Sequence, residues 1–202
     1  MHTALNNNGW LPEEQPYAVA PFNYAGWEAT TNVPTNAVDW VLVELRDALS
    51  PKTVLETRAA FILDNGFLAD LDGSAGVKFY TVAANKNYWV ALKHRNHLGI
   101  ATQAPVLLPN AQPVAFTQPN QVLQGLTCLT SLPNTPDFAL VAGNASAKKG
   151  VNTLADFNAL QAAQGQTNPY HPTDTNLDGQ TPSADLQLWL NNASKIALKW
   201  LR

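Results

Sequence analysis

The chain has 202 residues, of which 46% are hydrophobic and only 13% are charged, and its formal net charge is −3. This length provides room for one large domain or two small ones, each with its own core. The slightly negative charge and the lack of a Lys/Arg patch argue against nucleic acid as a partner, and no apolar run approaches the length of about 18 residues that indicates a membrane span.

Residues 1–36 combine frequent prolines with frequent aromatic rings. Because proline lacks a backbone N–H and fixes φ, we expect neither helix nor central strand here, but an extended segment that lies on a surface. The rings are interpreted as core anchors, with a platform for stacking sugars as the alternative. The candidate sugar-contacting rings of the chain are Trp10, Tyr24, Trp27 and, further along, Trp89.

Residues 38–46 alternate in a way that predicts a strand with one buried face. The Asp64-Asn65-Gly66 sequence predicts a tight hairpin turn between strands at 57–63 and 67–71. Short strands separated by turn residues are typical of an antiparallel β-sandwich, and we expect an Ig-like sandwich over residues 1–136. Further strands are expected at 77–82, 88–94, 106–108, 114–116 and 122–129.

A dense polar cluster, His94-Arg95-Asn96-His97, follows the strand expected at 88–94. His94 and His97 would point to opposite faces of a continuing strand, which disfavours a transition-metal site. We interpret the cluster as hydrogen-bonding loop backbone at the end of the sheet, with contact to a ligand as the alternative. The candidate ion-pair partners of Arg95 are Asp39, Glu44 and Asp47.

Catalysis has no support in the sequence. No Ser or Cys nucleophile lies in a known motif, no Gly-rich phosphate loop is present, and no pair of carboxylates is spaced as an acid and base. We therefore expect a protein that is not an enzyme.

Residues 174–185 carry the most specific pattern in the chain. Oxygen-bearing residues stand at positions 1, 3, 5 and 12 of a twelve-residue loop with glycine at position 6, which is the ligand spacing of a calcium loop. An Asp/Asn/Gly-rich turn that caps a helix is the alternative. One Ca²⁺ site is predicted, with the side chains of Asp174, Asn176, Asp178 and Asp185 and the carbonyl of Gln180 as ligands.

An internal repeat precedes this loop. A shift of 29 residues superposes Gly179 on Gly150 and Asp185 on Asp156. The earlier loop, residues 145–156, has Ala145, Ala147 and Lys149 at positions 1, 3 and 5, so it lacks the side-chain oxygens for an ion. Residues 137–202 are thus expected to form a small two-helix domain with one intact and one degenerate calcium loop.

This C-terminal part resembles a dockerin-type calcium domain, and the region before it resembles a domain of large secreted and cell-surface proteins of Bacteroidetes-type bacteria. The resemblance implies a secreted or cell-surface location, but no defined activity. The matching words are Ala20-Pro21-Phe22-x-Tyr24-x-Gly26, Val38-Asp39-Trp40-Val41-Leu42-Val43-Glu44-Leu45-Arg46-Asp47, Asp70-Leu71-Asp72-Gly73 and His94-Arg95-Asn96-His97-Leu98.

The sequence favours a noncatalytic extracellular structural or adhesive module that is stabilised by calcium and assembles with copies of itself or with protein partners. The alternatives are a carbohydrate-binding module and a dockerin-type docking module. The residues considered for contact with a partner or glycan are Trp10, Tyr24, Trp27, Trp89, His94, Arg95 and His97.

Overall fold

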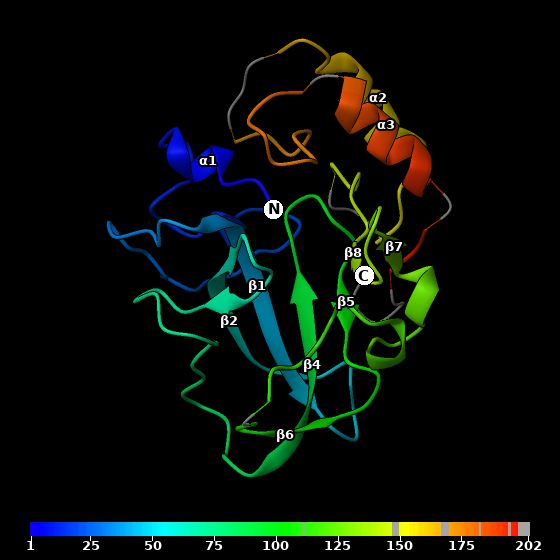
Figure 1. Cartoon of the computed structure of the whole chain (residues 1–202). Helices are drawn as coiled ribbons and strands as arrows, with labels where there is room; N and C mark the ends of the chain where they lie inside the picture. The colour runs from blue at the N-terminus through cyan, green and yellow to red at the C-terminus, as the bar shows by residue number, and fades with distance from the viewer. Residues whose placement is uncertain (111, 147–149, 167–169, 182, 194, 198–202) are drawn as a thin grey trace.

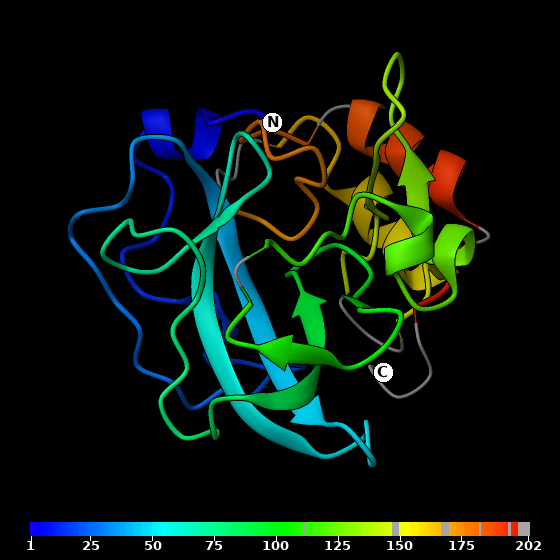
Figure 2. The ribbon, with the colours of Figure 1, turned by 60° about the horizontal axis from the view of Figure 1, so that its bottom comes forward.

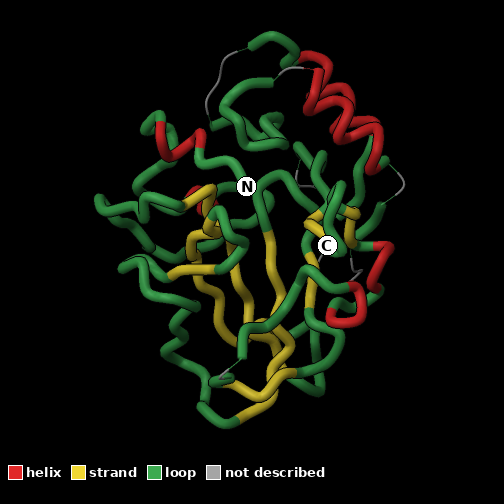
Figure 3. Tube along the Cα trace, in the orientation of Figure 1, coloured by secondary structure: helices red, strands yellow, loops and turns green. Residues whose placement is uncertain are grey.

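The computed structural model describes residues 1–110, 112–146, 150–166, 170–181, 183–193 and 195–197. It is mainly β, with a six-stranded antiparallel sheet that curls into a half-barrel and a separate two-stranded sheet (Figure 1, Figure 2). Two short helices near the C-terminus lie side by side at one end of the large sheet. Loops connect these elements over long stretches (Figure 3).

The strands of the large sheet run in the order β3-β2-β1-β4-β5, with β6 also paired to β4. Their bounds are β1 (Ala37–Asp47), β2 (Val54–Leu63), β3 (Leu68–Ala69), β4 (Lys86–Lys93), β5 (Ile100–Ala101) and β6 (Val106–Leu108). The small sheet pairs β7 (Leu129–Ser131) with β8 (Phe138–Leu140). The helices are α1 (Ala4–Asn7), α2 (Leu154–Ala162) and α3 (Ser183–Asn192), and the 3-10 turns are η1 (Pro16–Ala18), η2 (Pro119–Gln121) and η3 (Gly125–Thr127). Within the described ranges, none of these helices has the length and apolar character to cross a membrane.

The predicted strand at 38–46 is confirmed as β1, but both of its faces are buried rather than one. Val41 and Val43 face a cluster that also includes residues of β4, while Trp40 and Leu42 face a second cluster. The second cluster is closed by the N-terminal segment, whose Tyr17 is fully buried there. The segment therefore anchors itself by rings, as predicted, although it also contains the short helix α1.

Three other strand predictions are wrong. Residues 77–82 form no strand, because the Glu56 carboxylate accepts the backbone N–H groups of Tyr80, Thr81 and Val82 at 2.7–3.2 Å in place of a neighbouring strand. Residues 114–116 are loop, and 122–129 are mostly turn and 3-10 structure. The hairpin turn at 64–66 is confirmed, with Gly66 at φ +85°.

The expected domain division after residue 136 falls between β7 and β8, which pair with each other. Further along, the Leu98 N–H donates to the Val141 carbonyl at 2.8 Å, and His97 forms a bridge with Ala142. The end of β4 is thus hydrogen-bonded to the chain beyond the expected boundary. The division into two domains stays a prediction.

Buried charges lie on the central strand β1. Arg46 pairs with Glu44 on the same strand, and Lys93 of β4 approaches the other Glu44 oxygen at 2.7 Å. The Arg46 guanidinium also donates to the Pro51 carbonyl at 3.0 Å. Because the Arg46 side chain is only 4% exposed, its removal would leave Glu44 with less compensation in a desolvated place.

We expect Arg46→Met to lower the free energy of unfolding by about 3 kcal/mol, since breaking a buried ion pair leaves an uncompensated charge. Lys93→Met, at the more exposed partner, should cost about 1 kcal/mol or less. Urea unfolding followed by circular dichroism measures both. Equal losses in the two variants would contradict the view that Arg46 is the main counterion of Glu44.

Candidate metal centre

The predicted calcium loop, residues 174–185, leads into α3 and is folded around its own carboxylates. Asp174 and Asp185 are both 0% exposed. Asp174 accepts the backbone N–H groups of Asp178 and Gly179 at 3.0 and 2.9 Å, one on each carboxylate oxygen. The chain is thereby curled around the first acidic residue of the loop.

Asp185 closes the loop from α3. Its Oδ1 accepts the backbone N–H groups of Thr175 and Asn176 at 2.7 and 2.9 Å, and the Thr175 hydroxyl at 3.0 Å. Its Oδ2 is buried and has no hydrogen-bond partner among the described residues. Since a buried carboxylate oxygen without a partner costs free energy, this atom has the character of a cation ligand.

The electrostatics of the two buried acids favour a cation. Burial raises the pKa of Asp174 to about 7, and the nearby Asp185 carboxylate adds to the effect while backbone N–H groups oppose it. Burial likewise raises the pKa of Asp185 above its ordinary value. A divalent ion placed between the two would offset the cost of ionising them.

The other predicted ligands are nearby but point partly elsewhere. Asp178 Oδ1 accepts the Gln180 N–H at 2.9 Å, and its Oδ2 accepts from Asn176 Nδ2 at 2.9 Å. Across the described residues, no three His, Cys, Asp or Glu side chains converge as they would around a metal ion. A calcium site here would therefore depend on the Asn176 amide and the Gln180 carbonyl together with Asp174 and Asp185, which fits an ion that prefers neutral and charged oxygens alike.

Two residues with positive φ let the loop turn, and each is held by the N-terminal segment. Leu177, at φ +65°, inserts its side chain into the cluster that contains Leu5 and Tyr17. Gly179, at φ +85°, lies under Trp10, where a Cβ would come within 2.1 Å of the indole ring. Trp10 is thus interpreted as a packing residue of the loop, although 37% of it is exposed.

The polar cluster after β4 holds the loop from the other side. Arg95 Nη1 donates to the His171 carbonyl at 2.6 Å, and Asn96 Nδ2 donates to the Asp174 carbonyl at 2.6 Å. This agrees with the prediction that the cluster hydrogen-bonds loop backbone at the sheet end. The sequence places Asn96 in the His94–His97 cluster but predicts no contact for its own side chain.

Asp39 of β1 is the centre of this cluster. Its Oδ2 accepts from Arg95 Nε at 2.8 Å and lies 3.1 Å from His94 Nε2, while its Oδ1 accepts from the Tyr170 hydroxyl at 2.6 Å. Burial by itself raises the pKa of Asp39, but Arg95 and His94 outweigh it and hold this pKa below its ordinary value. Asp39 is confirmed as the partner of Arg95 among the three proposed. Tyr170 was missed, because no local pattern links it to a residue 131 positions away.

The expectation that His94 and His97 point apart is wrong. The strand ends at Lys93, the chain turns, and the two rings meet with their Nδ1 atoms 3.0 Å apart. Burial, followed by the nearby His94 and Arg95, lowers the pKa of His97 well below its ordinary value. The pair therefore joins the hydrogen-bond network of Asp39.

The described part of the earlier loop shares one hydrogen bond with the predicted calcium loop. Asp156 Oδ1 accepts the Ser146 N–H at 2.8 Å, just as Asp185 Oδ1 accepts the Thr175 N–H. Donor and acceptor of the second bond each lie 29 residues after their counterparts in the first. Asp156 Oδ2 instead accepts from the N–H and hydroxyl of Thr153, as in a helix capping box. Residues 147 and 149, two of the substituted ligand positions, lie outside the described residues.

The candidate sugar-contacting rings differ in their exposure. Trp27 is 90% exposed, whereas Tyr24 and Trp89 are partly buried. The Tyr24 hydroxyl lies 2.6 Å from Glu28 Oε1, and Trp89 Nε1 donates to the Ala48 carbonyl at 3.2 Å. Trp27 is the ring of this group that is most accessible to a ligand.

Comparison with protein-family models, with curated proteins and with solved structures finds no match for this chain.

We expect Arg95→Met to lower the free energy of unfolding at neutral pH by about 3 to 5 kcal/mol, because it removes the charge that compensates the buried Asp39. Since the folded-state pKa of Asp39 lies below its unfolded value of 3.8, this carboxylate stabilises the fold above about pH 4 and the contribution is lost as pH falls further. The difference between wild type and Arg95→Met should therefore shrink in acid, as measured by urea unfolding at several pH values.

Lys78→Met is the matched control, since it removes a cation from an exposed pair with Asp72. It should leave the free energy of unfolding nearly unchanged. A difference between wild type and Arg95→Met that is the same at every pH would contradict the assigned role of Asp39.

Proposed function

We propose that this chain is a noncatalytic extracellular module with a structural or adhesive role, stabilised by one calcium ion bound in residues 174–185. The observation that carries the calcium site is the buried, unpartnered Oδ2 of Asp185, in a loop whose backbone is already curled around Asp174. A secreted or cell-surface location is part of the same proposal, and extracellular modules can use calcium sites with a Kd of about 10⁻⁴ to 10⁻³ M.

The proposal includes a dockerin-like domain made of two loop–helix units. The two loop–helix units share the Asp156/Asp185 hydrogen-bond pattern, and Phe157 of α2 packs on Trp189 of α3 with ring centroids 5.1 Å apart. This supports a dockerin-like arrangement of residues 137–202. An Ig-like sandwich over residues 1–136 remains a prediction.

Calcium would stabilise more than its own loop. The loop contacts the N-terminal segment through Leu177 and Gly179, and Asn96, which follows β4, donates to its Asp174 carbonyl. Arg95 holds the His171 carbonyl just before the loop. An ion that orders the loop would thus also favour the docked state of both neighbours, which is the property expected of a structural module.

Assembly with copies of itself, or with partners, is supported by an exposed apolar end of the sheet, defined by Leu49, Val54, Leu55 and Leu107. Leu49 follows β1 and is 94% exposed. Arg46 of β1 pairs with Val54 of β2. On the other side of β1, Asp47 pairs with Tyr88 of β4, and the neighbouring Asn87 pairs with Leu107 of β6. The connection between β1 and β2 lies with β6 at the end of the sheet opposite α2 and α3 (Figure 1). Exposed apolar residues that lie together mark sites of protein contact. The proposed role as a fibre or filament subunit would need contact surfaces of this kind.

Calcium at about 100 times its Kd should stabilise the protein by about 2.7 kcal/mol, or a rise in melting temperature of about 5 to 10 °C, relative to protein with chelator. Asp185→Asn should abolish this rise. Differential scanning calorimetry with calcium and with chelator provides the measurement.

Asp156→Asn is the control, because it changes the equivalent residue of the earlier loop. It should lower the melting temperature in both conditions by weakening the cap of α2, yet keep the calcium-dependent rise. Identical melting curves for wild type with and without chelator would rule out a structural calcium ion.

Self-association should be weakened when charge is placed on the exposed apolar end. We expect wild-type protein with calcium to form larger species as concentration rises, and Leu49→Asp to shift it toward monomer. Sedimentation velocity over a concentration series, with electron microscopy of the same samples, tests this. Leu154→Asp, which changes an exposed leucine at the start of α2, should behave as wild type. Wild-type protein that stays monomeric throughout would contradict assembly of the chain with itself.

A further inference from the structure

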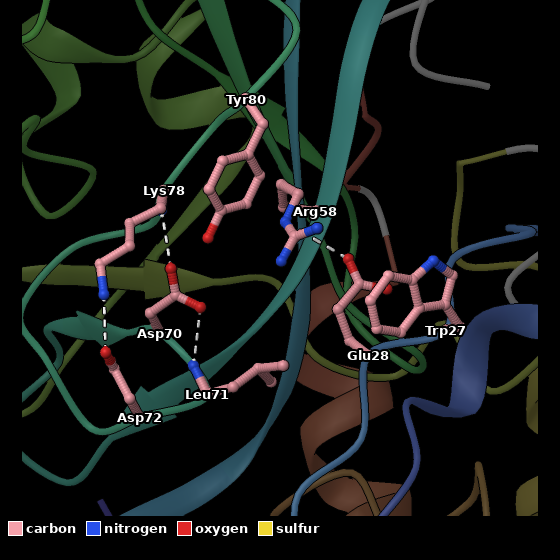
Figure 4. A pocket seen from close by; sticks show the side chains of 8 residues that line it. All are labelled: Trp27, Glu28, Arg58, Asp70, Leu71, Asp72, Lys78 and Tyr80. Carbon is pink, nitrogen blue, oxygen red and sulfur yellow. Dashed lines mark hydrogen bonds and ion pairs between the residues drawn. The ribbon is translucent and has the colours of Figure 1, made fainter.

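A pocket of about 360 Å³ lies beside β2, away from the calcium loop (Figure 4). Trp27 comes from the N-terminal segment and Tyr80 from the loop before β4, and their rings are 90% and 68% exposed. The other lining residues are Glu28, Arg58, Asp70, Leu71, Asp72 and Lys78.

The backbone on both sides of Trp27 is fixed although its ring is free. The Gly26 carbonyl accepts from Gln15 Nε2 at 2.8 Å, and Glu28, 3% exposed, accepts the Ala59 N–H at 3.2 Å. Gly26 permits this close packing, since a Cβ there would lie 2.3 Å from Glu28 Oε2. The exposed indole is thus presented from a rigid support.

Tyr80 is held in a similar way. Its backbone N–H donates to Glu56 Oε1 at 2.7 Å, and the Arg58 guanidinium lies 5.0 Å from the centre of its ring. Arg58 in turn approaches Glu28 at 3.4 Å, so the supports of the two rings are linked by an ion pair. The backbone that carries each ring is therefore held in place, which reduces the entropy lost when the two rings bind a ligand.

The polar lining carries both hydrogen-bond donors and acceptors. Asp72 and Lys78 form an exposed pair at 2.6 Å, and Asp70, 5% exposed, accepts the Lys78 N–H at 2.9 Å. The three carboxylates and two cations of the lining nearly balance in charge. This combination suits a neutral ligand that has an apolar face and many hydroxyl groups.

We propose that this pocket binds a neutral carbohydrate, with a sugar ring packed on Trp27 or Tyr80 and its hydroxyls hydrogen-bonded to Asp72, Lys78 and Arg58. The C–H groups on one face of a pyranose carry slight positive charge and fit the negative face of an aromatic ring. Hydroxyl groups both donate and accept, so they can use carboxylate and cationic partners at once. This site goes beyond the proposed structural role, because it names neutral carbohydrates as the ligands to which an adhesive module would attach.

The test is binding of the full chain, with calcium present, to an array of neutral and acidic glycans, followed by calorimetric titration with the neutral oligosaccharide that binds best. Trp27→Ala and Tyr80→Ala should each weaken binding by about tenfold or more. Phe67→Ala, which removes an exposed ring outside the pocket, should change the affinity by less than about twofold. Both pocket variants should keep the wild-type calcium-dependent rise in melting temperature, which separates this site from the calcium loop.

The proposal is overturned if wild-type protein retains no neutral glycan on the array. It is also overturned if the pocket variants bind as wild type does, or if binding is confined to polyanionic glycans and is lost in high salt, since screening by salt would identify a charge-driven contact.

Discussion

The buried carboxylate of Asp39 is the constraint on which the arrangement of the chain depends. It lies on the central strand and joins Arg95, at the end of β4, to Tyr170, in the segment that leads into the calcium loop. A desolvated carboxylate must be compensated, so these partners cannot leave it without a large cost. Because Arg95 also donates to the His171 carbonyl, the same ion pair positions the backbone that precedes Asp174.

The two loops that end at Asp156 and Asp185 share a hydrogen bond but differ in how the second oxygen of that Asp is used. In both loops the last Asp accepts the N–H of the second loop residue, so this acid organises the turn with or without an ion. In the earlier loop the remaining oxygen of Asp156 is satisfied by Thr153. The corresponding oxygen of Asp185 has no such partner among the described residues. The Thr153 hydroxyl at the start of α2 thus satisfies the Asp156 oxygen that corresponds to Asp185 Oδ2, the atom proposed to bind a cation.

Sequence patterns predicted the strands and turns that depend on residues close together in the chain. The period-two alternation of residues 38–46 and the Asn-Gly turn at 65–66 correctly located β1, β2 and the hairpin. The pattern at 77–82 failed because a single distant carboxylate, Glu56, satisfied backbone groups that a strand would otherwise have paired. The loop at 174–185 was recognised from spacing alone, whereas its contacts with Trp10 and Asn96 depend on chain segments more than 70 residues away.

The N-terminal segment links the calcium loop to the aromatic pocket. Trp10 packs on Gly179, Tyr17 donates to the Trp40 carbonyl at 2.6 Å in the core, and Trp27 reaches the pocket. Apart from α1 and η1, its prolines disfavour regular structure, so most of the segment crosses the surface as loop and is held by contacts such as these. The loop at residues 174–185 and the exposed Trp27 are therefore connected through one anchored segment, although they lie at different points along it.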